Sequence, residues 1–275
     1  MKNLSLFPIL IFSIIASSTS LPATQTQPTL HTNNRNSPIE QPAKLHNRPE
    51  QIVIHTGYRL SYNNETLCPN WVAWELTAHE TAGTARRSND FRADPAIPRV
   101  YQVTSEDYNH SGYDRGHMCP SADMKWNSIA QSESFFMSNI CPQLHSLNSG
   151  AWEKLERACR RWAKREDKVY IVCGPIYNAS RKALYVGKYK KIRVPNAFFK
   201  VVLSLKPGKE KAIGFYYTNR RNKQNMADAA KSVDEIEQIT GIDFFPQLNN
   251  SLENRIEAKY SLSEWQYNSY HDSST

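Results

Sequence analysis

A short stretch of the chain, residues 113–156, concentrates side chains that can act on a phosphodiester. It begins with Asp114-Arg115-Gly116-His117, in which an imidazole lies two residues from a guanidinium. A neutral imidazole can accept a proton from water near neutral pH, and a guanidinium matches the oxygens of a phosphate. These residue types in this order predict a phosphodiesterase site.

Two further residues of the stretch can serve a metal ion. Asn148 offers an amide oxygen and Glu156 a carboxylate, and hard cations such as Mg²⁺ accept both kinds of oxygen. The two residues lie about two helical turns apart and flank Trp152 and Leu155, so one helix can aim both toward one side. We therefore expect Asn148 and Glu156 to share one metal.

The segments DRGH, SNICPQ and LNSGAWEKLE, in this order, resemble those of the DNA/RNA non-specific endonucleases of the ββα-metal superfamily, which includes endonuclease G. The resemblance extends upstream through residues 86–95 and downstream through YIVCGPIY and VPNAFFKVVLSL, and it covers residues 51–260. It implies an α+β fold, with an antiparallel β-sheet core, packed helices and a ββα-metal active-site motif.

The resemblance also implies a role for each matching residue. His117 corresponds to the general base, and Asn148 to the direct ligand of Mg²⁺, with Mn²⁺ as an alternative ion. Glu156 corresponds to a carboxylate that orients water around the ion. Asn139, in the SNICPQ strand, either contacts the reacting groups or supports them through a hydrogen bond. Asp114 is expected to shape the turn by bonding backbone amides.

Phosphate binding is assigned to Arg115 and to one of the neighbours Arg86 and Arg87. Adjacent side chains point different ways, so only one of the latter two is expected to reach phosphate. We take Arg87 as the candidate and leave the choice open.

The expected activity is hydrolysis of internal phosphodiester bonds in DNA and RNA, which leaves 5′-phosphate products. Because this chemistry acts on the phosphodiester and not on the base, it predicts weak sequence preference. The net charge of +8 and the pI of about 9.2 favour polyanionic partners. Two alternatives remain: a nucleic-acid-binding protein without turnover, and a phosphodiesterase with another substrate. The intact set of His117, Asn148 and Glu156 favours an enzyme.

A zinc site is a further alternative for the same stretch. His117-x-Cys119 and Cys141-x₃-His145 offer nitrogen and sulfur ligands at local spacings. The sequence has no Cys-x-x-Cys pair, however, and the DRGH context explains His117 better.

The N-terminus predicts export. Lys2, the apolar residues 4–16 and the small residues 17–20 have the pattern of a signal peptide, so we expect a secreted or periplasmic protein without stable membrane association. An oxidising compartment allows up to two disulfides among five cysteines, and the two attractive pairings are Cys119 with Cys141 and Cys159 with Cys173. For any one of these cysteines, the alternative is a buried free thiol that acts as a small apolar residue.

Composition divides the chain into four parts: a signal peptide at residues 1–20, a flexible polar linker at 21–50, the endonuclease domain at 51–260 and a polar tail at 261–275, on which Trp265 can dock. Strands are predicted at residues 52–54, 58–62, 71–76, 169–173, 198–205 and 212–217. Helices are predicted at residues 128–136, 149–164 and 227–240, the last ending before Gly241. The oligomeric state is not determined by the sequence, and a homodimer is one of the states it allows.

Overall fold

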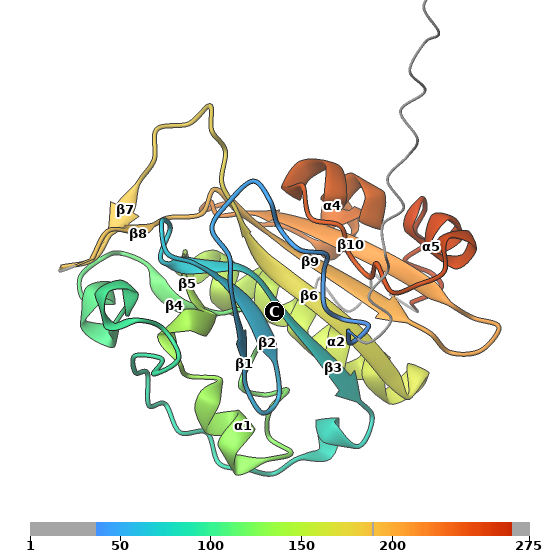
Figure 1. The fold of residues 1–275 in the computed structure, drawn as a ribbon. Coiled ribbons are helices and arrows are strands. Elements are labelled where there is room, and N and C mark those ends of the chain that lie inside the picture. Colours follow the sequence, from blue (N-terminus) through green and yellow to red (C-terminus); the bar gives the residue numbers. More distant parts are fainter. Residues whose placement is uncertain (1–36, 189, 266–275) are drawn as a thin grey trace, which may run out of the picture. The chain divides into compact units, whose positions relative to one another are not determined.

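The centre of the fold is an antiparallel sheet of seven strands, shown in Figure 1. The computed structural model describes residues 37–188 and 190–265. The strand order is β1-β2-β3-β6-β9-β10-β11, and the bounds are β1 Gln51–Ile54, β2 Arg59–Asn63, β3 Cys68–Thr77, β6 Lys168–Ile176, β9 Ala197–Ser204, β10 Lys211–Thr218 and β11 Ala230–Lys231. The six predicted strands all lie in this sheet, so the prediction is confirmed.

Alternation along the strands places apolar side chains on both faces of the sheet. On β3, Val72 and Trp74 belong to one buried cluster, and Trp71 and Ala73 to the other. Every residue of β9 is buried. Such a sheet needs cover on each side, which is the α+β arrangement that the sequence predicted.

Helices supply that cover (Figure 1). On one face, α2 (Glu153–Glu166) contributes Leu155 and Trp162 to the first cluster. On the other, α4 (Val233–Thr240) and α5 (Asn250–Glu257) contribute apolar side chains to the second cluster. The remaining elements are short: α1 (Ser128–Glu133), α3 (Met226–Ala229), the pair β7 (Tyr185–Val186) and β8 (Ile192–Arg193), and 3₁₀ turns at Glu80–Ala82, Arg99–Tyr101, Ser105–Tyr108 and Met137–Asn139.

A second, two-stranded sheet joins α2 to make a ββα unit. Its strands β4 (Asp114–His117) and β5 (Ile140–Gln143) are antiparallel, and a wide helical turn, Leu147–Trp152, leads from β5 into α2. Gly116 permits the close approach of the strands, since a Cβ there would lie 2.3 Å from Gln143 Oε1. The DRGH segment is therefore a strand whose glycine is required by its neighbour.

One predicted helix is broken in the structure. Residues 227–240 form α3, the two residues of β11, and then α4. Ser232 and Glu235 form a capping box, in which each side chain accepts a hydrogen bond from the backbone amide of the other. This box restarts the helix at residue 233 and overrides the apolar periodicity on which the prediction relied. The predicted end is confirmed, because Gly241 follows with φ 65°.

The predicted linker and tail are partly ordered against the body. Glu40 and Leu45 are buried, and Arg59 Nε donates to Glu40 Oε1 at 3.2 Å, so the end of the expected linker packs on the sheet. Trp265 is buried and lies 4.9 Å from Trp162 between ring centroids, as docking of the tail predicts. The signal peptide expected at residues 1–20 lies outside the described residues. Within the described part of the chain, no helix has both the length and the apolar character that crossing a membrane requires.

The disulfide prediction is wrong. All five cysteines are buried free thiols, and Cys173 Sγ donates to the Met118 carbonyl at 3.2 Å. Burial raises the pKa of Cys159 and of Cys173 to about 12, so these sulfurs stay protonated. The cysteines act as small apolar core residues, a role that sequence spacing cannot distinguish from pairing.

Thiol counting tests this assignment. We expect the native protein to react slowly with a thiol reagent such as DTNB, because no sulfur is exposed. After denaturation without reductant, all five cysteines should react. A count of one or three under the denaturing condition would show that disulfides form.

Candidate active site

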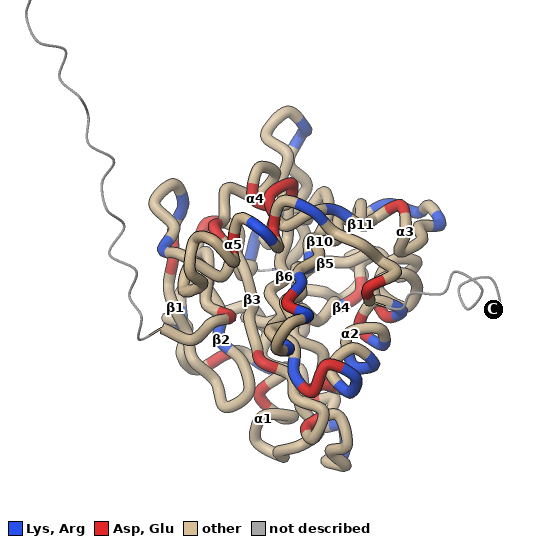
Figure 2. The backbone as a smooth tube through the Cα atoms, turned by 90° about the vertical axis from the view of Figure 1, so that its right-hand side faces the viewer, with Lys and Arg blue, Asp and Glu red and all other residues tan. Residues whose placement is uncertain are grey.

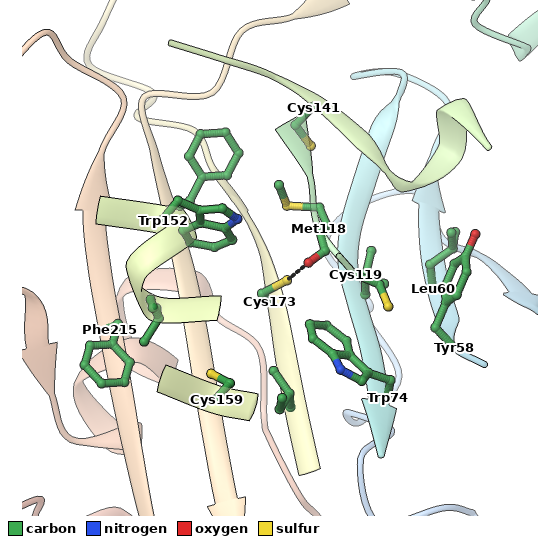
Figure 3. Close-up of a cluster of buried hydrophobic side chains, with 14 of the residues drawn as sticks. Tyr58, Leu60, Trp74, Met118, Cys119, Cys141, Trp152, Cys159, Cys173 and Phe215 are labelled. Atoms are coloured by element: carbon green, nitrogen blue, oxygen red, sulfur yellow. Dashed lines mark hydrogen bonds between the residues drawn. The ribbon is translucent and has the colours of Figure 1, made fainter. Parts of the chain in front are cut away.

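The site lies where β4, β5 and the start of α2 meet above the sheet. Trp152 holds this junction together, since its Nε1 donates to the His117 carbonyl at 3.3 Å. Its ring packs against Phe198 at 5.7 Å and Tyr217 at 6.4 Å between centroids. Figure 3 shows Trp152 in one buried cluster with Met118, Cys173 and Trp74. The start of α2 is therefore fixed on the end of β4.

His117 lies against two phenylalanine rings. Phe135 meets the imidazole edge to face, with centroids 5.0 Å apart, and Phe91 lies 5.3 Å away. The residue is half-buried, but its Nε2 atom is beneath the surface and has no hydrogen-bond partner in the described part of the chain. Burial, and then the charge of Arg87, lowers the pKa of His117 to about 3. The imidazole is thus neutral at physiological pH and can accept a proton.

The same two rings carry the candidate phosphate-binding groups. The Arg87 guanidinium lies 4.9 Å from the Phe135 centroid, and that of Arg115 lies 4.6 Å from the Phe91 centroid. Arg87 also donates from Nε to Asn89 Oδ1 at 2.7 Å and from Nη1 to Ser121 Oγ. Both arginines are exposed residues, so they can meet a ligand from solvent.

Arg86 differs from its neighbour. Both residues are exposed, but Arg87 is close enough to His117 and Glu156 to interact with both electrostatically. The structure therefore brings Arg87, and not Arg86, to the candidate base.

Asp114 joins β4 to the turn before α2. Its Oδ2 accepts hydrogen bonds from Asn148 Nδ2 at 2.9 Å and from His145 Nδ1 at 2.8 Å. Because the amide nitrogen of Asn148 faces this carboxylate, its oxygen is the end left to face a metal. The expectation that Asp114 bonds backbone amides in a turn is wrong, since it is a strand residue that orients side chains.

Glu156 lies in the first turn of α2, which begins at residue 153 and not at the predicted residue 149. Burial raises the pKa of its carboxyl to about 7, an effect that the nearby Lys200 and Arg160 reduce and Asp123 increases. The same carboxylate raises the pKa of Arg87, which burial alone lowers. Glu156 therefore lies within electrostatic reach of the arginine beside His117.

Lys200 was missed by the sequence analysis. It lies on β9 with no exposed surface, and its Nζ is 4.4 Å from the Trp152 ring centroid and 5.2 Å from that of Trp74. Within residues 37–188 and 190–265, that Nζ has no hydrogen-bond partner. Burial lowers the pKa of Lys200, but nearby groups that include Glu156 and Asp123 raise it overall, so the lysine remains charged. The lysine within the otherwise apolar segment AFFKVVLS is the sequence feature that could have predicted a buried charge beneath the site.

Asp123 was also missed. It is fully buried, and it accepts hydrogen bonds from Arg160 Nη1 at 2.7 Å and from Trp74 Nε1 at 3.2 Å. With Glu156, Lys200 and Arg160 it forms a balanced set of two acids and two bases beneath the site. Its position in a segment without periodicity gave no sequence signal.

Asn139 does not reach the site surface. It is fully buried; its Nδ2 donates to the carbonyls of Cys119 at 2.8 Å and Ser134 at 2.9 Å, and its Oδ1 accepts from Cys119 N at 2.9 Å. Of the two roles expected for Asn139, the geometry fits the supporting one, because its amide is engaged by backbone on both ends.

The donor set fits a hard metal ion and not zinc. The amide oxygen of Asn148 and the carboxylate of Glu156 are ligands that Mg²⁺ or Mn²⁺ accepts. Within residues 37–188 and 190–265, three or more His, Cys, Asp or Glu ligand atoms converge in one place alone, between α4 and α5. The zinc alternative built on His117, Cys119, Cys141 and His145 is therefore wrong.

A ββα unit with a neutral histidine between arginine-covered rings has the architecture expected of a ββα-metal nuclease. Comparison with known proteins confirms this class. Residues 35–251 match the DNA/RNA non-specific endonuclease family, and the chain belongs to this family of hydrolases that act on nucleic acids.

Relatives come from several lineages. A nuclease of Nostoc sp. is 35% identical over 219 residues, which cover 76% of this chain and 78% of the relative. Human mitochondrial endonuclease G is 30% identical over 210 residues, covering 72% and 70%. The mitochondrial nuclease EXOG of Xenopus laevis is 32% identical over 208 residues, covering 71% of this chain but 58% of the longer relative.

A solved structure shares the fold. The crystal structure of the EndoG/EndoGI complex, which concerns the mechanism of EndoG inhibition, superimposes with a TM-score of 0.69 and 29% identity. The match covers 74% of this chain and 89% of that chain.

The buried state of His117 predicts a measurable pH dependence of stability. Its pKa of about 3 in the folded chain lies below the unfolded value near 6.5, so the unfolded chain binds more protons between these values. The stability of the wild type should therefore fall as the pH decreases from 6.5 to 5, with a contribution from His117 of about 2 kcal/mol. His117→Ala should lack this contribution in urea unfolding, and His110→Ala, at an exposed histidine, should retain it. If the free energy of unfolding changed equally with pH in all three proteins, the assignment would be contradicted.

Proposed function

We propose that this chain is a metal-dependent endonuclease that hydrolyses internal phosphodiester bonds of DNA and RNA to 5′-phosphate products. The observation that carries the proposal is the His117 imidazole, which is neutral and unpartnered at Nε2 and lies between two rings topped by Arg87 and Arg115. The family match supports the same chemistry.

The His117 imidazole accepts the proton of the attacking water. Its low pKa keeps the imidazole free of a proton before the reaction, and the approach of an anionic phosphate favours the protonated form that the reaction creates. Arg87 and Arg115 bind phosphate oxygens and offset the charge that develops in the transition state. The phenylalanine rings hold both guanidiniums in place.

Asn148 is the proposed ligand of Mg²⁺, with Mn²⁺ as an alternative, and Glu156 is proposed to orient the water around the ion. The bound ion would supply positive charge to a phosphate oxygen and to the 3′ leaving oxygen. Asp114 keeps the Asn148 oxygen turned outward by holding the amide nitrogen. Because this set touches phosphate and metal alone, DNA and RNA are both proposed as substrates.

Localisation rests on the N-terminal sequence. We propose export, because residues 1–20 have the pattern of a signal peptide. The buried thiols are compatible with an oxidising compartment, since none is exposed to pair. A homodimer is not required by any residue of the proposed mechanism.

Plasmid and RNA cleavage test the proposal. With Mg²⁺, the purified protein should convert supercoiled plasmid through nicked and linear forms to short fragments and should degrade RNA; a chelator should stop both. His117→Ala should lower kcat by at least about a hundredfold, the usual size of general base catalysis. Arg87→Ala should slow all substrates by similar factors, and the matched control Arg86→Ala should stay near wild type.

Three results would overturn parts of this account. Near-normal cleavage by His117→Ala would remove the base. An intact circular plasmid beside shortened linear DNA would show an exonuclease. Binding without cleavage, or cleavage of small phosphodiesters alone, would favour one of the two alternative functions.

A further inference from the structure

A second group of carboxylates lies across the sheet from the candidate active site. In Figures 1 and 2, α4 and α5 lie side by side, and both contact β10. Their buried residues Val233, Ile236 and Ile256 belong to the second core cluster, whereas β5 and α2 contribute to the first. Nothing proposed for phosphodiester cleavage uses this face.

Three acidic residues converge between these helices. Asp234 and Glu237 lie about one turn apart on α4, and Glu257 is the last residue of α5. One carboxylate oxygen from each lies within 4.8 Å of the others. Asp234 and Glu237 are partly exposed, so solvent can enter from one side.

Glu257 supplies an independent sign of a ligand. Its relative exposure is 3%, and its Oε1 is buried without a hydrogen-bond partner among the residues that the structure describes. A buried carboxylate oxygen that lacks a donor is costly. A cation among the three residues would satisfy it.

The acidic residues around Glu257 make an uncompensated carboxylate at this position still more costly. Burial, and then the charges of Glu237, Glu253, Asp234 and Asp243, raises the pKa of Glu257 to about 9. Glu237 has a pKa of about 7, also raised first by burial, although it accepts a hydrogen bond from Phe244 N at 2.7 Å. Burial and neighbouring like charges both favour the neutral form of these carboxyls.

We propose that Asp234, Glu237 and Glu257 bind a divalent cation of the size of Ca²⁺, which joins α4 to α5. All three oxygens lie within 4.8 Å of one another, close enough for one ion to contact each of them. Three protein carboxylates suit Ca²⁺, which accepts several of them in a flexible geometry, better than Mg²⁺, which keeps most of its waters and usually takes one or two carboxylates. Water completes the coordination of Ca²⁺.

Calorimetry and thermal unfolding of the purified, chelator-treated protein test the site. At constant pH and ionic strength, Ca²⁺ should bind with one site in the Asn148→Ala variant, in which the proposed active-site ligand is absent. Saturating Ca²⁺ should raise Tm by roughly 5 °C, and Mg²⁺ should bind at least about tenfold more weakly.

Glu257→Gln should raise the Kd for Ca²⁺ by at least about tenfold and remove the Tm response. It should leave the Tm in chelator near the wild-type value, because Glu257, with a pKa of about 9, is uncharged at neutral pH when no ion is bound and Gln replaces a neutral group, and it should leave nuclease activity unchanged. Glu264→Gln, at an exposed residue outside the group, is the matched control and should bind as wild type does. The proposal is overturned if Ca²⁺ leaves Tm unchanged, if Glu257→Gln responds like wild type, or if Mg²⁺ binds equally well. These outcomes do not depend on nuclease activity, so a failure here is distinct from a failure of the proposed function.

Discussion

The Asp114 carboxylate is the contact on which the arrangement of the site depends. Asp114 begins the strand that ends at His117, and its Oδ2 accepts hydrogen bonds from Asn148 and His145 beyond the paired strand. One short strand therefore positions the proposed base directly and the proposed metal ligand through a side chain. Hydrogen bonds to a carboxylate are charge-assisted, and they set which end of the amide faces outward.

Beneath this contact lies a layer of buried charge. Lys200 lies between two tryptophan rings, and Asp123 is held by Arg160 and Trp74. Isolated buried charges would be costly, but opposite charges in this layer offset one another. The layer keeps a positive charge near Glu156 while Trp152 fixes the helix on β4. The sheet thus provides electrostatic as well as mechanical support.

The features that could be predicted from the sequence are those that local residue patterns determine. Apolar runs such as AFFKVVLS identify strands without knowledge of their partners, and the DRGH segment points to His117 by its residue types alone. Features set by tertiary contact were not predictable. The direction of Arg87 relative to Arg86, the backbone partners of Asn139 and the neighbours of Lys200 depend on how distant segments meet. The disulfide prediction failed because compartment chemistry says nothing about where cysteines pack.

A reciprocal exchange at the Asp114–Asn148 pair tests the central claim most directly. In Asp114→Asn/Asn148→Asp, the amide of residue 114 can donate to the carboxylate of residue 148 and still accept from His145. The measurement is the Mn²⁺ concentration for half-maximal plasmid cleavage. We expect each single exchange to raise it by about tenfold or more, and the double exchange to recover most of that loss. If the double variant raised this Mn²⁺ concentration by the product of the two single increases, the account would be contradicted.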